Sequence, residues 1–358
     1  MRDRGVGAMR RAERAKEIQA DPPRALPWAS RFRGISRAES VAGHLAAVAA
    51  IFLLTVVPVE GQAFRTPWGD PDLQGTWTNQ TLTPLERPAE FAGKPVLTEA
   101  EAAAYEARLR QQNNADIRTP GTRRDVTVAY NDFWWDRGDR IVADRRTSLV
   151  IDPADGRIPP LTPAAQAKAA AARSRNEAQG DNPASWEDVD VYSRCIIRSA
   201  LPRLSTGYNN NYEIVQTPGY VAILQEQIHD TRIILLDGRP HLSGTVRQWL
   251  GDPRGRWEGD TLVVETTNFT DEARGSTFRD ATRNMVLVER FRRVDANTID
   301  YQFTVTDPAA WTRPWTVKMP WNKETGLMYE YACHEGNYGL ANTLRSARVA
   351  EKAAQQQK

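Results

Sequence analysis

The chain has 358 residues, of which 41% are hydrophobic and 26% charged, and its formal net charge is +2 at pH 7. This composition is that of an ordinary globular protein, long enough to bury a sizeable core in one large domain or two ordinary ones. A net charge so close to zero gives no electrostatic signature of a nucleic-acid-binding protein.

The first 63 residues have the pattern of an export signal. Arginines precede an apolar stretch from Leu45 to Val57, and small residues end at Ala63. The apolar stretch is shorter than a membrane-spanning helix requires, and Gly61-Gln62-Ala63 suits a signal peptidase. We therefore predict that residues 1–63 are an export signal with an extended basic leader and that the mature protein is periplasmic or secreted. The alternative is an uncleaved membrane anchor.

The apparent basicity of the chain belongs to this N-terminal segment. Removing its ten basic and six acidic residues from the totals of 47 and 45 leaves 37 and 39, a net charge of about −2. We therefore expect no nucleic-acid partner, and no membrane association after the signal is cleaved.

Only two cysteines occur, Cys195 and Cys333, and both lie in the predicted exported part. In an oxidising compartment a single pair favours a disulfide. Two cysteines so far apart in the chain do not by themselves indicate a zinc site.

Two alanine-rich stretches predict helices. In the first, Thr98 and Glu101 form a capping box. In the second, Thr162 is the N-cap and Pro163 occupies the first helical position. Both stretches are largely polar, so we expect them to lie outside a core that is formed elsewhere in the chain.

Short strands punctuated by turn residues dominate the chain from residue 205 onward, after earlier strands near residues 75–81 and 146–152. The turns are expected at Pro218-Gly219, Asp237-Gly238, Glu258-Gly259-Asp260 and Asp295-Ala296-Asn297, and residues 315–335 are expected to form a last hairpin. The predicted fold is mainly β, an antiparallel meander that closes into a barrel or a two-sheet sandwich, with the two helices peripheral. We expect a single β-rich domain over residues 64–350 and a disordered tail over residues 351–358.

Five segments carry a family resemblance: PDLQGTWT, RRTSLVIDPADGRIPPLT, GYNNNYEIVQTPGY, RGRWEGDTLVVETTNF and YEYACHEGNYG. Together they resemble a family of exported bacterial β-rich proteins with no established activity, which implies export and a single β-rich unit but no mechanism. Gly75-x-Trp77 also resembles the G-x-W opening of lipocalin-like barrels, in which the tryptophan plugs one barrel end. The same pattern recurs at Gly255-x-Trp257.

Three histidines follow the predicted signal, His229, His241 and His334, and all lie in the β-rich half. Three imidazoles suit Zn²⁺ or Cu²⁺ with an open coordination position, although their spacing matches no metal-binding motif. The alternative is that they are structural or surface histidines.

Strand alternation gives His334 a carboxylate partner on its own face. A regular strand over residues 328–336 would place Glu330 and His334 on one face and Cys333 on the other. Over residues 225–232 the same alternation places His229 on one face and Glu226 and Asp230 on the other. A histidine with a carboxylate can act as a general acid/base pair, so we predict that His334 and at least one other histidine face a shared polar cavity. Cys333 would then serve the fold.

A second group of candidates combines aromatic and polar side chains. Trp134, Trp135, Asp136 and Arg137 could form a platform for a sugar or an aromatic ligand, and Asn209 and Asn211 could bind its polar groups. Alternatively, the tryptophans fill the core or cap a barrel end, and the asparagines serve a turn that needs positive φ.

Several classes of site are missing from the sequence. It contains no G-x-S-x-G nucleophile elbow, no P-loop, no dinucleotide fingerprint and no haem attachment motif. We therefore expect neither a nucleotide nor a haem cofactor.

These features support three hypotheses. The first is an exported enzyme of hydrolase or lyase type that acts on a small molecule in a pocket at the mouth of the barrel or sandwich. It would use acid–base or metal-assisted chemistry, with His229, His241, His334, Asp230 and Glu330 as its catalytic residues. The second is a binding protein for a small apolar, aromatic or sugar-like ligand. The third is a structural envelope protein. The sequence favours the enzyme slightly, because histidines and carboxylates share the same segments.

Overall fold

The structure, a computed structural model, describes residues 64–122, 125, 130–179, 182–198, 201–271, 278 and 280–356. These residues belong to one compact unit, residues 61–358. The predicted export signal, residues 1–63, lies outside the described residues.

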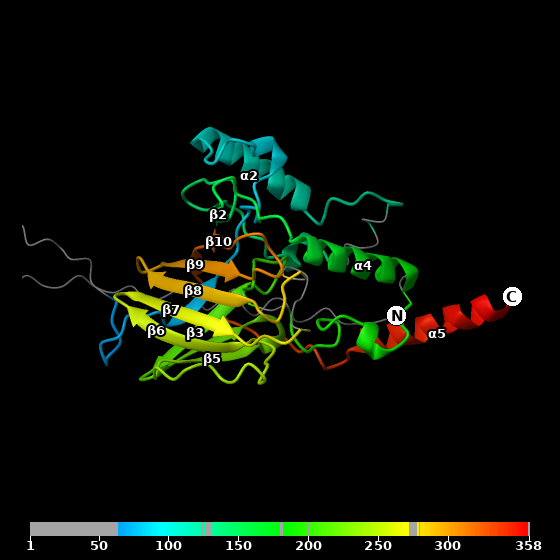
Figure 1. Cartoon of the computed structure of the whole chain (residues 1–358). Helices are drawn as coiled ribbons and strands as arrows, with labels where there is room; N and C mark the ends of the chain where they lie inside the picture. Colours follow the sequence, from blue (N-terminus) through cyan, green and yellow to red (C-terminus); the bar gives the residue numbers. More distant parts are fainter. Residues whose placement is uncertain are drawn as a thin grey trace, which may run out of the picture. The chain divides into compact units, whose positions relative to one another are not determined.

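Within the described residues, nine strands form a closed barrel, and two further strands lie outside it (Figure 1). The barrel strands are β1 (Gly75–Thr78), β3 (Asn211–Thr217), β4 (Tyr220–Gln225), β5 (Thr231–Leu235), β6 (Asp252–Glu258), β7 (Thr261–Thr267), β8 (Val286–Arg293), β9 (Thr298–Thr306) and β11 (Trp321–Lys323). The outer strands are β10 (Trp315–Lys318) and β2 (Val150–Asp152). The mainly β fold and the barrel, one of the two predicted forms, are thus confirmed.

The predicted turns make three of the hairpins. Pro218-Gly219 joins β3 to β4, Gly259-Asp260 joins β6 to β7, and Asp295-Ala296-Asn297 joins β8 to β9. Gly219 has φ +84°, a value that glycine adopts without strain. The meander is not wholly antiparallel, because β5 and β6 pair in parallel, through Leu235 and Arg254. The chain between them, residues 236–251, is long enough to reverse direction and return alongside β5.

The prediction that residues 315–335 form a hairpin is wrong. Strands β10 and β11 do not pair with each other but follow one another along β9, from Trp315 opposite Val305 to Trp321 opposite Ile299. Pro320 separates them, and proline has no N–H with which to continue the ladder. Strand β11 then pairs with β1 and closes the barrel. No strand forms over residues 328–336.

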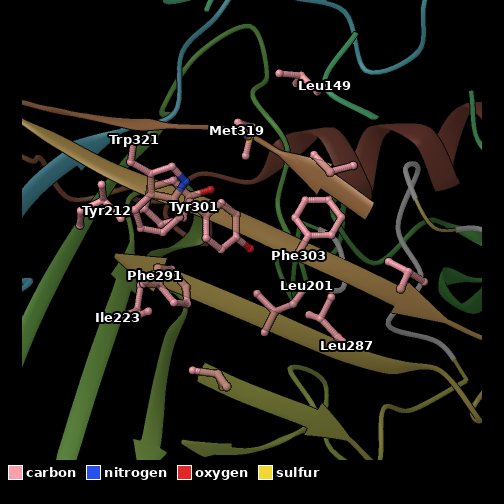
Figure 2. Close-up of a cluster of buried hydrophobic side chains, with 14 of the residues drawn as sticks. Leu149, Leu201, Tyr212, Ile223, Leu287, Phe291, Tyr301, Phe303, Met319 and Trp321 are labelled. Atoms are coloured by element: carbon pink, nitrogen blue, oxygen red, sulfur yellow. The ribbon is translucent and has the colours of Figure 1, made fainter. Parts of the chain in front are cut away.

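Aromatic rings fill much of the barrel interior (Figure 2). Tyr212 stacks on Trp321 with ring centres 4.2 Å apart, and Tyr301 lies 4.7 Å from Phe291 and 4.9 Å from Trp321. Trp77, the tryptophan of the first G-x-W, is also buried and donates its indole N–H to the carbonyl of Leu73 at 2.9 Å. The interior is therefore a packed core.

One ion pair is buried among these rings. Arg232 on β5 and Glu289 on β8 are 4% and 1% exposed, and they form a bidentate contact that includes a 2.9 Å bond from Nη2 to Oε1. The Tyr301 hydroxyl donates to the same Oε1 at 2.7 Å. Buried charges need such partners, because each loses its hydration on folding.

Three α-helices lie within the described part of the chain: α2 (Glu99–Asn113), α4 (Pro163–Gln179) and α5 (Tyr338–Gln356). The first two are the predicted alanine-rich helices. Thr98 and Glu101 form the predicted capping box of α2, and the Thr162 hydroxyl accepts the N–H of Ala165 at the start of α4. None of the described helices combines the length and the apolar character needed to cross a membrane. Helix α5 was not predicted, and it includes residues 351–356, where a disordered tail was expected.

We expect Glu289→Ala to destabilise the protein by about 3–5 kcal/mol, because it leaves the Arg232 guanidinium buried without its charge partner. The double variant Arg232→Met/Glu289→Leu, which removes both charges and fills the space, should cost much less. Urea denaturation of each variant measures the loss. Glu258→Ala, which breaks an exposed ion pair, is the control and should cost far less than Glu289→Ala. A double variant as unstable as the single one would contradict this account.

Candidate functional site: an aromatic cavity with an acidic wall

A cavity of about 660 Å³ lies where β3 begins and β4 ends. Seven aromatic side chains line it. Four come from residues 130–135 (Tyr130, Phe133, Trp134 and Trp135), one is Tyr208 just before β3, and two, Tyr329 and Tyr331, come from the segment that follows β11. Three stretches that are distant in sequence therefore build one aromatic wall.

The outer part of this wall is an exposed apolar rim. Phe133, Trp134, Leu327 and Tyr329 are 82%, 62%, 75% and 70% exposed, and Phe133 meets Trp134 edge-to-face at 5.3 Å between ring centres. Large apolar side chains scattered singly over a surface need no explanation, but a group of them around one cavity marks an interaction site.

The inner wall is polar and acidic. Asp136 and Glu226 both line the cavity, together with Asn209 and Asn211, and no lysine or arginine is among the described residues that line it. Glu226 is buried and accepts the N–H of Asn211 at 3.3 Å. Burial raises the pKa of Asp136, and the negative charge of Glu226 raises it further, although a hydrogen bond from Asn210 acts in the opposite direction. The cavity therefore holds two carboxylates that repel one another.

One polar atom of this wall has no protein partner. The side-chain oxygen of Asn211 is buried and accepts no hydrogen bond within the structure. A buried acceptor without a donor is costly, so a ligand that donates a hydrogen bond or carries positive charge would be favoured here.

The structure brings together five of the six predicted ligand-binding residues: Trp134, Trp135, Asp136, Asn209 and Asn211. The sixth, Arg137, does not line this cavity. Its guanidinium lies 3.8 Å from the ring centre of Trp135 and donates to the carbonyl of Asn113 at 3.0 Å, and it lines a neighbouring cavity of about 630 Å³. Asn209 also has φ +54°, so it serves a turn that needs positive φ, the alternative role considered for the asparagines, as well as lining the cavity.

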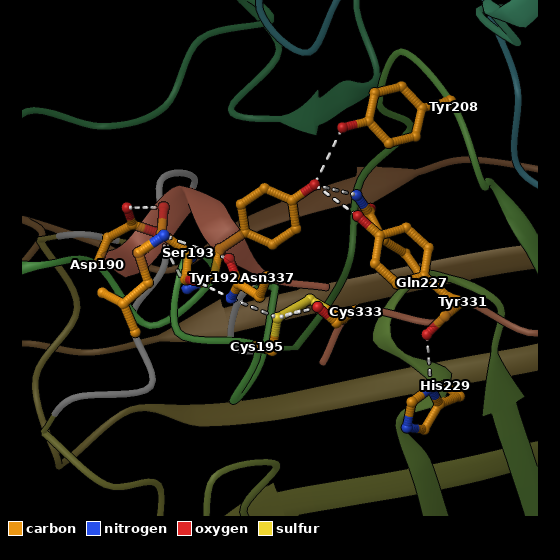
Figure 3. Close-up of a disulfide and its surroundings, with 11 residues drawn as sticks. Asp190, Tyr192, Ser193, Cys195, Tyr208, Gln227, His229, Tyr331, Cys333 and Asn337 are labelled. Carbon is orange, nitrogen blue, oxygen red and sulfur yellow. Dashed lines mark hydrogen bonds between the residues drawn. A yellow bond between two sulfur atoms is a disulfide. The ribbon is translucent and has the colours of Figure 1, made fainter. Parts of the chain in front are cut away.

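Three tyrosine hydroxyl groups meet beside the cavity (Figure 3). The hydroxyl of Tyr192 lies 3.0 Å from that of Tyr208 and 2.8 Å from that of Tyr331, and the Gln227 amide donates to it at 3.3 Å. Tyr208 and Tyr331 line the cavity, whereas Tyr192 does not. The cluster therefore connects the cavity to a buried polar region.

The predicted disulfide between Cys195 and Cys333 is confirmed, with Cα atoms 5.7 Å apart. It lies three residues after Tyr192 and two residues after Tyr331, so it holds together the two segments that carry the tyrosine contact. Cys333 thus serves the fold, as predicted. The side-chain amide of Asn337 adds a second link, a 3.0 Å bond to the carbonyl of Ser193.

The structure does not place the three histidines around one cavity, and none of them lines the aromatic one. His229 is exposed, and its Nδ1 donates to the backbone carbonyl of Tyr331 at 3.0 Å, so it supports the cavity wall. His241 lies between Asp252 and Glu265: its Nδ1 is 3.1 Å from the carboxylate of Asp252 and its Nε2 is 3.1 Å from that of Glu265. His334 and Glu330 are exposed.

Two local features of the backbone explain why the histidines do not share a cavity as predicted. Residues 328–336 form no strand, so the alternation that paired Glu330 with His334 does not apply. After β4 the chain turns through a short 3₁₀ segment, Gln227–His229, in which Ile228 and His229 both have positive φ. No group of three His, Cys, Asp or Glu side chains in the described part of the chain could hold a metal ion.

Unusual backbone conformations gather around the cavity. Of the six described non-glycine residues with positive φ, four lie here: Cys195, Asn209, Ile228 and His229. For a β-branched residue such as Ile228 this conformation is strained, at a cost on the order of 1–3 kcal/mol. Strain of this kind is often found at functional sites, so it independently marks this cavity as a candidate site.

Sequence reasoning missed Glu226, Tyr192, Tyr208 and Tyr331. Glu226 was placed on a regular strand face, Tyr331 was assigned to the packed face with Cys333, and Tyr192 and Tyr208 were given no role. Their proximity depends on the disulfide and on the turn after β4, which residue periodicity does not show.

No protein-family model, curated protein or solved structure matches this chain. The predicted membership of an exported family and the lipocalin-like resemblance therefore stay predictions.

We expect the double variant Cys195→Ser/Cys333→Ser to lose about 3–5 kcal/mol of stability, because the disulfide closes a loop of 138 residues. Denaturation in urea, compared with the oxidised wild type, measures the loss. Adding reductant should lower the stability of the wild type to that of the variant and leave the variant unchanged. Equal stability of the oxidised wild type and the variant would show that the cross-link does not constrain the unfolded chain.

A pH-dependent prediction concerns Asp230, whose pKa burial raises to about 6, although the positive charges of Arg203 and His229 favour its ionised form. Its pKa in the unfolded chain is about 3.9, so the folded protein binds more protons between about pH 4 and 6. Stability therefore falls as pH rises through this window, by at most about 3 kcal/mol.

Asp230→Asn removes this titration. The variant should match the wild type near pH 4 and be more stable by about 1–3 kcal/mol at pH 7, as measured by urea denaturation across that range. Asp237→Asn, at an exposed aspartate after β5, is the control and should show no such gain at pH 7. A gain for Asp230→Asn that is the same at both pH values would contradict the prediction.

Proposed function

We propose that this protein binds a small organic cation, a protonated amine or a quaternary ammonium with an apolar or aromatic body, in the aromatic cavity. The observation that carries the proposal is the composition of the lining: in the part of the chain that the structure describes, it has seven aromatic rings and two carboxylates and no lysine or arginine. Of the hypotheses drawn from the sequence, this is closest to the binding protein.

Each part of the lining suits such a ligand. The face of an aromatic ring attracts a cation, by about 0.5–1 kcal/mol when exposed and about 2 kcal/mol or more when desolvated. Asp136 and Glu226 repel one another, and a cation between them would relieve that repulsion. The unpaired oxygen of Asn211 adds a further negative end of a dipole.

The cavity size also fits. At about 660 Å³ it is in the range of small-molecule sites, which combine an apolar lining with a few polar groups that orient the ligand. The exposed rim of Phe133, Trp134 and Tyr329 would be covered in part by the apolar body of the ligand.

The enzyme hypothesis rested on histidines, and their placement gives it little support. His229 contacts backbone, His241 is held between two carboxylates away from the cavity lining, and His334 is exposed. The disulfide supports the proposal that the protein acts in an oxidising compartment, as the predicted export signal implies.

The test uses benzyltrimethylammonium as the probe, with benzyl alcohol and benzoate as neutral and anionic probes that carry the same ring. Calorimetry should show that the cation binds at least about tenfold more tightly than benzyl alcohol, and that benzoate binds no better than the alcohol. Tighter binding of benzoate, or equal binding of all three, would contradict the charge argument.

Variants locate the site. Trp134→Ala should weaken the binding of benzyltrimethylammonium by about 5- to 30-fold, which corresponds to a loss of about 1–2 kcal/mol of cation–π attraction. Asp136→Asn should weaken it about tenfold while leaving benzyl alcohol unaffected. Trp186→Ala is the matched control, because Trp186 is similarly exposed but does not line the cavity.

A further inference from the structure

The orientation of Gln227 makes the oxygen of Tyr192 a hydrogen-bond acceptor. The side-chain oxygen of Gln227 contacts Nη2 of Arg203, and a guanidinium only donates, so the amide oxygen must be the atom that faces it. The NH₂ group of Gln227 is then directed at Tyr192, 3.3 Å from its oxygen. Arg203 is buried, and its charge polarises the amide and makes it a stronger donor.

Two further hydroxyl groups meet the same oxygen, those of Tyr208 and Tyr331, at 3.0 and 2.8 Å. A neutral tyrosine oxygen has two lone pairs and one proton of its own. If all three neighbours donate, as the phenols and the amide can, Tyr192 has no acceptor among them for its own proton. With that donor pattern the arrangement suits an ionised Tyr192, with three donors around its oxygen, whereas a neutral Tyr192 would donate to one of the two phenols.

We propose that Tyr192 is the acid–base group of the aromatic cavity, and that it exchanges a proton with a bound ammonium ligand through the hydroxyl of Tyr208 or Tyr331. This inference rests on the proposed function, because it requires an ammonium ligand in the cavity. Tyr192 does not line the cavity, so it acts through the tyrosines that do.

The proton transfer balances without any further reactant. The N–H bond of the ligand breaks and its proton passes to the oxygen of Tyr208 or Tyr331, while that hydroxyl gives its own proton to the Tyr192 oxygen. The electron pair of the N–H bond stays on nitrogen, so the ligand becomes a neutral amine and Tyr192 becomes neutral. The reverse transfer restores the starting state. Such a relay is the usual task of a general acid–base tyrosine.

The surroundings of Tyr192 change its pKa in both directions. Burial raises the pKa of Tyr192, but the hydrogen bonds from Tyr208, Tyr331 and Gln227 and the guanidinium of Arg198, 4.2 Å from its ring centre, outweigh burial and lower it.

The pKa values of the other two tyrosines change in the opposite direction. Burial and the contact with Tyr192 raise the pKa of Tyr208 to about 12, and they raise that of Tyr331 as well. The other charged groups around the cluster are Arg203, behind Gln227, and the carboxyl groups of Asp190, Glu226 and Asp230. Tyr192 is therefore the member of the cluster that ionises first.

The first arm of the test needs no ligand. Tyrosinate absorbs in the near ultraviolet, where neutral tyrosine does not, so titration of the wild type should show one tyrosine equivalent that ionises before all the others. Tyr192→Phe, which keeps the ring beneath Arg198, should lose that step. Tyr220→Phe, at an exposed tyrosine on β4, should keep it. Unfolding curves verify that both variants are folded. The absence of an early step, or its persistence in Tyr192→Phe, would overturn the inference.

The second arm compares two probes at the pH where the early step is complete. Benzyldimethylammonium can donate a proton, whereas benzyltrimethylammonium cannot. The first should reduce the tyrosinate absorbance by one equivalent on binding, and the second should leave it unchanged. If both bind without changing it, no proton is exchanged and the inference fails while the proposed function stands. If neither binds, the proposed function fails and this inference with it, whatever the first arm shows.

Discussion

The Cys195–Cys333 disulfide is the constraint on which the cavity depends. It joins two segments that contain neither strand nor long helix, residues 191–198 and 324–337. The barrel is held by continuous backbone ladders, but the second of these segments leaves it at β11 and has few backbone bonds of its own. Cys333 fixes its course and brings Tyr331 to Tyr192. The covalent bond thus holds a wall of the cavity that backbone pairing does not define.

The barrel forms the opposite wall of the cavity, and its backbone ladder makes this wall rigid. Asn211 begins β3 and Glu226 follows β4, so the ladder between these strands sets the distance between an amide and a carboxylate of the site. The strained turn at Ile228 then buries Gln227 and directs it at the tyrosine cluster. Burial of the Ile228 side chain helps to offset the strain, and His229 ties the turn to the backbone of Tyr331. A side-chain bond therefore connects the two walls, in addition to the disulfide, which holds the first wall in place.

The sequence predicted those features that local chemistry determines. A capping box at Thr98, turns such as Pro218-Gly219 and the single cysteine pair all act through neighbouring residues or through redox chemistry. Alternation failed where the backbone departs from regular geometry, as at Ile228 and over residues 328–336. No local sequence pattern predicts that β5 and β6 pair in parallel, because the course of the 16-residue connection between them sets their relative direction.

The candidate site shows the same limit. Trp134, Trp135 and Asp136 were predicted together because they are adjacent in the chain, and Asn209 and Asn211 because three asparagines in a row stand out. Glu226 and the three clustered tyrosines come from four separate stretches, and only the folded chain brings them together. The histidines were conspicuous because they are few, but scarcity in a sequence says nothing about position in space.

The position of the cavity follows from the packing of the barrel. Lipocalin-like barrels hold ligands inside, but here Tyr212, Phe291, Tyr301 and Trp321 occupy the interior in ring-to-ring contact, and the Arg232–Glu289 pair is enclosed with them. A ligand entering there would have to displace packed rings and separate a buried ion pair. The free energy lost in doing so would be far larger than the binding free energy of a small molecule. The proposed binding is therefore confined to the strand ends, where loop residues supply the aromatic rings and the end of β4 positions the carboxylate of Glu226.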